Sequence, residues 1–285
     1  MELKAACVIG WPVEHSRSPL IHTYWLRQLG ITAEYRREAV PPDRLAEFVA
    51  HLGDRGYVGA NVTVPHKEAV MRLSRPDALA QAVGAANTLW FEDGELRATN
   101  TDVEGFVASL DAAVPGWSAD LGQAVDNAVG NAVVLGAGGA ARAVVFGLRE
   151  RGLRHIRVVN RSFDRAAAMR ARFGDAVVPA AWEKRNDVLA GARLLVNTTT
   201  LGMIGQEALD VDLARLAGNA VVADIVYSPL ATPLLAAARA RGLAAADGLG
   251  MLLYQARGAF MRFFGNRPEV TAGLRALVEA DLVGV

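Results

Sequence analysis

The sequence predicts an α/β protein with two domains, the second of which contains a doubly wound parallel sheet. Short apolar runs that are typical of strands alternate with longer segments of helical pattern along most of the chain. A glycine-rich turn follows one of these apolar runs and precedes a helical segment. The length of 285 residues suggests two domains, because a domain usually contains about 100–200 residues.

The composition excludes several classes of protein. The chain is neutral, with 30 Lys+Arg and 30 Asp+Glu, and 52% of its residues are hydrophobic. This excludes intrinsic disorder and a nucleic-acid-binding protein that relies on an overall positive charge. The one cysteine, Cys7, excludes an internal disulfide and a metal site with several cysteines. We find neither a secretory signal nor the about 20 apolar residues of a membrane span, and we expect a cytoplasmic protein without membrane or nucleic-acid partners.

The first half of the chain predicts a mixed α/β unit. Ser18 is a good N-cap residue, Pro19 suits the first turn of a helix, and Gly30 is suited to end it. The pair Asp93-Gly94 is typical of a two-residue β-hairpin turn. The expected strands are 5–10, 33–37 and 59–64, the expected helices are 19–29, 43–52 and 68–83, and the hairpin covers 87–97.

The second half has a different pattern, which begins after an Ala/Gly/Asp-rich stretch at 111–130 that we interpret as a domain boundary. Apolar strands that are joined by helices indicate a parallel sheet that is buried on both faces. The last 40 residues are mainly helical in pattern. The expected strands are 133–135, 156–160, 194–197 and 220–225, and the expected helices are 142–151 and 164–173.

The turn Gly136-x-Gly138-x-x-Ala141 joins the first of these strands to a helix. The first glycine permits a tight turn, the second lets a pyrophosphate approach the backbone, and the small third residue allows close packing of helix and strand. The N-terminus of the helix favours an anion. In this setting the motif predicts a dinucleotide site, and the alternative is a tight turn without a ligand.

The end of the next strand indicates which dinucleotide. An NAD site usually has an acid about 20 residues after the glycines, where it binds the ribose 2′-hydroxyl. This chain has Asn160-Arg161-Ser162, with Arg165 close behind. Because a guanidinium is permanently charged and can bind two phosphate oxygens, the pattern favours NADP, and the nearby Asp164 leaves NAD as the alternative. The missing acid also argues against a methyltransferase that uses S-adenosylmethionine.

Polar motifs in the first half each have a purely structural alternative. Ser16 and Ser18 lie at the start of a predicted helix, where unpaired N–H groups either are capped or bind a ligand. Strand alternation places Asn61 and Thr63 on one face, with Lys67 just past the end of the strand. The alternative for this second motif is a half-exposed strand that is followed by a surface lysine.

Three further positions carry polar side chains of interest. The alternative for Asn87 is an ordinary turn, and 101–104 (TDVE) has the spacing of a capping box that includes Asp102. Gln255 lies on an apolar stripe of a predicted helix, so its amide needs a partner in the protein, in water or in a ligand. The histidines do not have the spacing of metal ligands, and we expect no metal site.

Ten short motifs extend along nearly the whole chain. They are SRSP (16–19), NVTVPHK (61–67), GAANT (84–88), NTD (100–102), GAGGAAR (136–142), NRS (160–162), NTT (197–199), LGM (201–203), Tyr227 with Thr232-Pro233-Leu234, and DGLGMLLYQA (247–256). In this combination and order, they resemble the shikimate dehydrogenase family.

The resemblance implies an NADP-dependent oxidoreductase that interconverts shikimate and 3-dehydroshikimate by hydride transfer at C3, in aromatic amino acid biosynthesis. It implies that Lys67 and Asp102 are the catalytic pair and leaves open which of them takes the proton. The residues that it implies for substrate binding are Ser16, Ser18, Thr63, Asn87, Tyr227 and Gln255. For the cofactor they are Gly136, Ala137, Gly138, Gly139, Ala140, Asn160, Arg161, Ser162 and Arg165, with Ile225 and Gly248 beside the nicotinamide.

The resemblance also implies the division of the chain. A discontinuous substrate domain would cover 1–103 and 249–285, a Rossmann-type NADP-binding domain would cover 104–248, and the active site would lie in the cleft between them. The partner would be a small molecule, shikimate or a close polyol. Monomer and homodimer are equally open.

Some positions depart from the family pattern, and they keep other functions open. Ala86 replaces the usual Val beside Asn87, Thr200-Leu201 replaces a Ser-Val type pair, and Gly205-Gln206 stands where many members have a proline. One alternative is therefore a paralogue with quinate or aminoshikimate as its main substrate, or with weak shikimate activity. A second is a non-catalytic NADP-binding regulator, against which the intact Lys67 and Asp102 argue.

Overall fold

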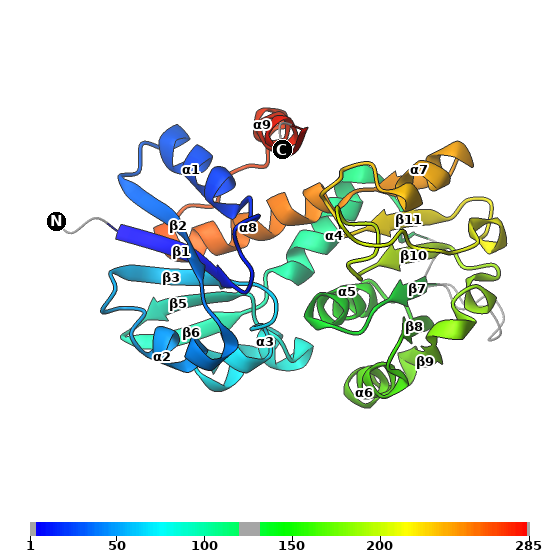
Figure 1. Ribbon diagram of the computed structural model, residues 1–285, viewed down its shortest axis with the longest axis horizontal. Coiled ribbons are helices and arrows are strands. Elements are labelled where there is room, and N and C mark those ends of the chain that lie inside the picture. Colours follow the sequence, from blue (N-terminus) through cyan, green and yellow to red (C-terminus); the bar gives the residue numbers. More distant parts are fainter. Residues whose placement is uncertain (1–3, 120–131, 284–285) are drawn as a thin grey trace. The chain divides into compact units, whose positions relative to one another are not determined.

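The computed structural model describes residues 4–119 and 132–283. The chain divides into two compact units (Figure 1). Unit 1 contains Met1–Asp102 and Leu253–Val285, and unit 2 contains Val103–Leu252. Part of the predicted boundary stretch, 120–130, lies outside the described residues.

Unit 1 is built around a mixed six-stranded sheet with the order β2-β1-β3-β5-β6-β4. The strands are β1 (Lys4–Gly10), β2 (Ala33–Ala39), β3 (Tyr57–Val62), β4 (Arg75–Pro76), β5 (Thr88–Glu92) and β6 (Glu95–Thr99). Strands β1, β2 and β3 are parallel, whereas β5 is antiparallel to both β3 and β6. The predicted hairpin is confirmed, because its turn residues Asp93 and Gly94 both have positive φ angles, of 52° and 77°.

Unit 1 also contains helices and short helical turns. They are α1 (Ser18–Gln28), η1 (Pro42–Arg44), α2 (Leu45–Ala50), η2 (Ala69–Arg72), α3 (Ala78–Val83), most of α8 (Gly248–Phe264) and α9 (Ala272–Val283). Successive residues of β1 point to opposite faces, so Cys7 belongs to a core with Phe48 and Leu52, whereas Val8 packs with Tyr35 and Phe263. Cys7 is therefore a core residue.

Unit 2 contains an all-parallel six-stranded sheet with the order β12-β11-β10-β7-β8-β9. The strands are β7 (Ala132–Leu135), β8 (Ile156–Asn160), β9 (Val177–Ala181), β10 (Leu194–Asn197), β11 (Val221–Asp224) and β12 (Ala244–Ala246). The order reverses at β7, from which the chain proceeds first to β8 and later to β10. This topology confirms the predicted doubly wound fold.

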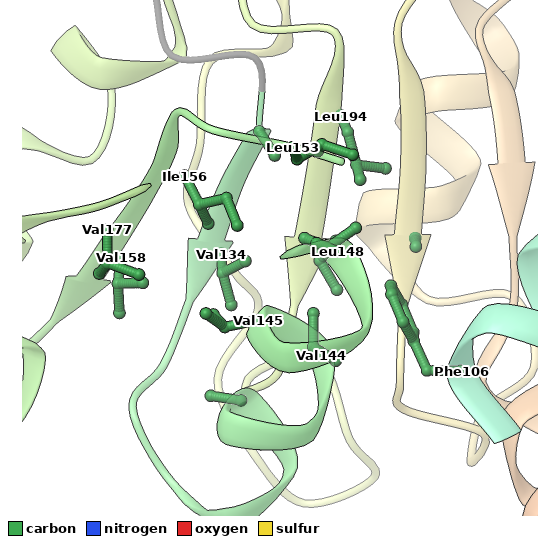
Figure 2. Close-up of a cluster of buried hydrophobic side chains, with 14 of the residues drawn as sticks. Phe106, Val134, Val144, Val145, Leu148, Leu153, Ile156, Val158, Val177 and Leu194 are labelled. Atoms are coloured by element: carbon green, nitrogen blue, oxygen red, sulfur yellow. The ribbon is translucent and has the colours of Figure 1, made fainter. Parts of the chain in front are cut away.

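Helices cover both faces of the second sheet. They are α4 (Asp102–Ala113), α5 (Gly139–Glu150), α6 (Phe163–Phe173) and α7 (Pro233–Ala240), with the turns η3 (Gly174–Ala176), η4 (Trp182–Lys184), η5 (Asp187–Leu189) and η6 (Leu213–Arg215). On one face, Val134 packs with Val144 and Leu148 of α5 (Figure 2). On the other face, Leu135 packs with Leu235 of α7. The central strands β7, β10 and β11 are buried along their whole length, as expected for a parallel sheet that is covered on both faces.

The structure corrects the expected helix at 68–83. This segment contains η2, the short strand β4 and α3 in succession. Pro76 is the physical reason, because a proline has no N–H and forces the preceding residue out of the helical region. The chain therefore runs extended at Arg75 and Pro76, which pair with β6.

Besides β4, two strands were missed, and several element ends were misplaced. Strand β9 reads VVPAA, in which the proline argues against a strand, and β12 reads AAA, which lacks the β-branched and aromatic residues that identify strands. Helix α5 begins at Gly139 rather than at 142, and β3 ends at Val62 rather than at 64. Among the described residues, no helix is both long and apolar enough to cross a membrane.

Candidate functional site

Lys67 and Asp102 meet in unit 1. Lys67 lies in the loop after β3, and Asp102 is the first residue of α4. The ammonium of Lys67 donates a hydrogen bond of 2.6 Å to Oδ2 of Asp102, and both side chains are largely buried, with exposed fractions of 15% and 6%. Lys67 is therefore not the surface residue of the alternative interpretation.

Asn87 is the centre of the surrounding network. Its Nδ2 donates to Oδ1 of Asp102 over 2.8 Å and to Oε1 of Gln255 over 3.3 Å. Its Oδ1 accepts from the backbone N–H of Thr101 over 2.7 Å and from the hydroxyls of Thr88 and Thr101. Because donors surround one end of the amide and acceptors the other, its orientation is fixed.

Asp102 therefore accepts hydrogen bonds at both carboxylate oxygens, one from Lys67 and one from Asn87. Its own N–H is bound by Oδ1 of Asn100 over 3.0 Å, and the Thr101 hydroxyl bonds to Asn87. These hydrogen bonds join the side chains of the site to one another, and they are not the bonds of a capping box. Both oxygens of the Asp102 carboxylate are thus used as acceptors.

Ser16 and Ser18 lie at the start of α1. The helix begins at Ser18, its N-cap residue is Arg17, and the Arg17 side chain makes no capping bond. The expectation that Ser18 is the N-cap is wrong, because Ser18 is already the first residue of the helix and Arg17 occupies the N-cap position. Oγ of Ser16 accepts from the N–H of Ser18 over 3.3 Å, so this hydroxyl lies against the N-terminus of the helix. The two serines thus stand at a helix end that favours an anion.

The loop after β3 is held from several sides. Thr63 follows the strand rather than belonging to it, and its N–H donates to the carbonyl of Ile9 over 2.9 Å. The buried His66 bonds through Nε2 to the carbonyl of Val40 over 2.7 Å, which fixes the residue before Lys67. No pattern in the sequence indicated that His66 has this role. The predicted strand through Thr63 did not point to it either.

In unit 2, the glycine-rich turn has the geometry that a dinucleotide needs. Gly136 has a φ of 107°, and a Cβ there would lie 2.5 Å from Oγ1 of Thr198, so only glycine fits. Gly138 is the N-cap residue of α5, and because glycine has no side chain it makes no capping hydrogen bond. A Cβ on Gly138 would meet no described atom within 4 Å. The described atoms therefore leave space beside the backbone of Gly138, as the close approach of a pyrophosphate requires.

The predicted ribose-phosphate residues lie together at the end of β8. Asn160 is the last residue of the strand, and its Nδ2 donates to the carbonyl of Ser162, the N-cap residue of α6, over 2.9 Å. Arg161 and Arg165 are both exposed. Two guanidinium groups that are free of burial can reach a phosphate at this turn.

A buried carboxylate organises the end of β11. Asp224 accepts from Asn197 over 2.9 Å, from the N–H of Val226 over 3.0 Å and from the Thr232 hydroxyl over 2.8 Å. Burial raises the pKa of Asp224, and these three hydrogen bonds act against the increase. The segment that carries Ile225 is thereby tied to β10 and to the start of α7.

Gly248 packs directly against the same segment. A Cβ on Gly248 would lie 2.2 Å from the carbonyl oxygen of Ile225, so this glycine is required by close backbone approach. Tyr227, the remaining predicted substrate residue, follows two positions after Ile225 and belongs to unit 2. Within the described chain, no cluster of three or more His, Cys, Asp or Glu residues has the arrangement of a metal site.

Comparison with known proteins identifies the family of this chain. The family model for the shikimate dehydrogenase substrate binding domain matches residues 8–89, and the model for shikimate / quinate 5-dehydrogenase matches residues 121–227. A shikimate dehydrogenase (NADP(+)) from Rhodopseudomonas palustris strain BisB18 is 60% identical over 280 residues, which are 98% of each chain. The chain belongs to the shikimate dehydrogenase family.

Solved structures agree with this family membership. A shikimate 5-dehydrogenase from Thermus thermophilus, in complex with NADP(H) and shikimate, has a TM-score of 0.83 and 36% identity over 98% of this chain and 99% of that one. A quinate dehydrogenase from Corynebacterium glutamicum, in complex with NAD, has a TM-score of 0.85 and 30% identity over the same shares. The predicted family and fold class are therefore confirmed, and the two similar structures contain different dinucleotides.

Proposed function

We propose that this chain is an NADP-dependent shikimate dehydrogenase, which interconverts shikimate and 3-dehydroshikimate in the route to aromatic amino acids. The observation that carries the proposal is the buried Lys67–Asp102 pair, held by Asn87 at 2.8 Å from the carboxylate. The assignment agrees with relatives at 60% identity over nearly the full chain that are named shikimate dehydrogenase (NADP(+)).

Lys67 carries the proton in this reaction. In the direction of reduction, its ammonium donates a proton to the C3 oxygen of the substrate, and in oxidation the amine takes the proton from the C3 hydroxyl. Asp102 accepts from Lys67 over 2.6 Å, so it holds the amine in place and stabilises its charged form. When bound, NADP accepts the hydride from C3, or NADPH supplies it.

The substrate is held by hydroxyl and amide groups. Ser16 and Ser18, at the N-terminus of α1, are assigned to the shikimate carboxylate. Asn87 and Gln255 are buried and hydrogen-bonded to each other, and with Thr63 they are assigned to the ring hydroxyls. Tyr227 of unit 2 completes the proposed set by its place in the family motif. Such a site discriminates against analogues that lack a hydroxyl, because buried polar groups would be left unpaired.

The cofactor is assigned to unit 2, whose turn geometry fits it. The pyrophosphate contacts are assigned to the turn Gly136, Ala137, Gly138, Gly139 and Ala140, and the 2′-phosphate contacts to Asn160, Arg161, Ser162 and Arg165. Ile225 and Gly248, which touch each other through the backbone, are assigned to the nicotinamide.

The proposal extends to the organisation of the molecule. We assign substrate binding to the domain 1–103 with 249–285 and NADP binding to 104–248, and these ranges agree in outline with the two compact units. We further propose a cytoplasmic enzyme, active as a monomer or as a homodimer.

Two other functions make different predictions. A quinate-directed paralogue is favoured by the likeness to the quinate dehydrogenase of known structure, which is in complex with NAD. Against it stands Arg161 at the position where an NAD site usually has an acid. A non-catalytic NADP-binding regulator would have no use for a buried ion pair beside Asn87, because such a pair is costly to bury.

The test is an initial-rate comparison with the purified protein, using shikimate and quinate, each with NADP and with NAD. We expect fast reduction of NADP with shikimate and much slower rates in the other three combinations. A preference for quinate or for NAD would replace the proposed function by that of the paralogue. NADP binding without turnover of either polyol would favour the regulator.

A further inference from the structure

The hydroxyl of Tyr35 is bound to the strand that leads toward Lys67. Tyr35 belongs to β2 and is buried, with 6% of its surface exposed. Its hydroxyl donates a hydrogen bond of 2.7 Å to Oδ1 of Asn61 on β3. One phenol therefore holds the side-chain amide of Asn61 on this strand.

Asn61 carries the connection onward to Asn87. Its Nδ2 donates to the carbonyl oxygen of Asn87 and to the hydroxyl of Thr88, both over 3.2 Å. Because Oδ1 of Asn61 accepts from Tyr35, the amide cannot rotate by 180° without placing its NH₂ against the phenol proton. Tyr35 thus sets the orientation in which Asn61 holds Asn87.

The next links in the same direction end at the catalytic pair. Asn87 donates to Oδ1 of Asp102, whose Oδ2 accepts from Lys67. The whole chain of contacts lies within unit 1, and Tyr35, Asn61, Asn87 and Asp102 are all buried. Buried hydrogen bonds of this kind are strong constraints on geometry, because an unpaired partner is costly.

The ring of Tyr35 is itself fixed. It stacks on His22 with ring centroids 4.0 Å apart and an interplanar angle of 10°. Its centroid lies 6.4 Å from the ring centroid of Phe263 in α8. Burial raises the pKa of Tyr35, so the hydroxyl keeps its proton and stays a donor to Asn61. The hydroxyl is held in one place and in one protonation state.

We propose that Tyr35 is a positioning residue, which fixes Asn61 and through it Asn87 at the hydroxyl end of the substrate. This inference rests on the proposed function, because the hydroxyl end is defined by shikimate. Tyr35 makes no assigned contact with the substrate and acts through Asn61. Its loss should therefore affect the binding of the polyol and leave the binding of NADP unchanged.

The test compares Tyr35→Phe with the matched control Tyr57→Phe. Tyr57 is a buried tyrosine of β3 that belongs to a different core cluster from Tyr35, and its hydroxyl donates to Glu38, outside the network. Each variant keeps its ring and loses one hydroxyl. For both we would measure kcat and KM with shikimate and NADP, the Kd of NADP by fluorescence, and the melting temperature.

We expect Tyr35→Phe to raise the KM for shikimate by about tenfold, the upper end for one hydrogen bond, with the Kd of NADP unchanged. Tyr57→Phe should keep the wild-type KM. An equal KM in the two variants, or a loss of NADP affinity in Tyr35→Phe alone, would overturn the positioning role. Wild-type protein that binds shikimate in calorimetry without turning it over would refute the proposed function instead, and the Tyr35→Phe effect on that binding would still decide the inference.

Discussion

The ammonium of Lys67 lies 2.6 Å from Oδ2 of Asp102, although 35 residues separate them in the chain. The other oxygen of the carboxylate accepts from Asn87, so Asp102 has an acceptor role on both sides. A protonated Asp102 would lose one of these bonds. In the proposed mechanism, Lys67 therefore moves the proton, and Asp102 positions the amine of Lys67.

Replacement of Lys67 by methionine should remove turnover while preserving binding. Lys67→Met keeps most of the stem and loses the amine, so we expect kcat to fall by about 10²–10⁴-fold, the range for a proton-transfer group. Asp102→Asn should lower kcat as well, because an amide NH₂ would face either Lys67 or Asn87. Steady-state kinetics with shikimate measure both. Lys184→Met, at an exposed lysine paired with Asp187, is the control, and turnover that survives both site variants would refute the mechanism.

Gly138→Ala should separate cofactor binding from folding. Among the described atoms, none lies within 4 Å of a Cβ at Gly138, and its φ of −90° suits alanine, so the melting temperature should stay at the wild-type value. If the pyrophosphate lies against this backbone, the methyl group will collide with it. We expect the Kd of NADP to rise about tenfold or more, because overpacking costs about 1–3 kcal/mol.

The control for this variant is Gly218→Ala, whose Cβ is equally unobstructed in the part of the chain that the structure describes, but which lies outside the glycine-rich turn. It should leave both the melting temperature and the Kd unchanged. An unchanged Kd in Gly138→Ala would mean that the turn does not bind the pyrophosphate.

The local features of this fold could be predicted because they depend on neighbouring residues. The turn at Gly136 needs a positive φ, and Asp93-Gly94 needs two, so glycine in these settings is informative without any tertiary context. Family motifs identified Lys67 and Asp102, but not their separation. Strand β12 escaped prediction because three alanines carry no strand signal of their own, and its pairing with β11 decides its conformation.

The site network could not be predicted from local patterns. Asn87 meets Gln255 across 168 residues of sequence, and no spacing rule covers such a contact. The N-cap rule failed at Ser18 because the helix begins one position earlier than the rule predicts, with Arg17 rather than Ser18 at the N-cap. Asn61 was noticed as a strand residue, but its bond to Tyr35 depends on the register of β1, β2 and β3.

Arg161 should decide between the two dinucleotides. Arg161→Leu removes an exposed guanidinium that can bind the 2′-phosphate, and hydrogen bonds to charged groups contribute about 1.5–3 kcal/mol. We expect kcat/KM for NADP to fall by about tenfold to about a hundredfold, with that for NAD nearly unchanged. Arg170→Leu, at an exposed arginine of α6 that pairs with Asp175, is the matched control. Equal losses with NADP and NAD in Arg161→Leu would exclude a contact with the 2′-phosphate.

The stability of the protein should depend on pH through His22. This side chain is fully buried among aromatic rings, and neither ring nitrogen has a hydrogen-bond partner among the described residues. Burial lowers the pKa of His22 from 6.5 to about 3. His22 therefore binds a proton below about pH 6.5 in the unfolded chain, but only below about pH 3 in the folded chain.

Acid should therefore destabilise the folded protein through His22. The folded state has its full stability with respect to His22 above pH 6.5, and it loses stability as the pH falls toward 3, at up to about 1.4 kcal/mol per pH unit. In His22→Phe, which retains an aromatic ring against Tyr35, this loss should disappear. Urea unfolding at about pH 7 and about pH 4.5 measures it, and the difference between the two pH values should be smaller in the variant by about 2 kcal/mol or more. An equal difference in both proteins would mean that His22 takes up its proton in the folded state, which its burial among Trp25, Tyr35 and Phe260 argues against.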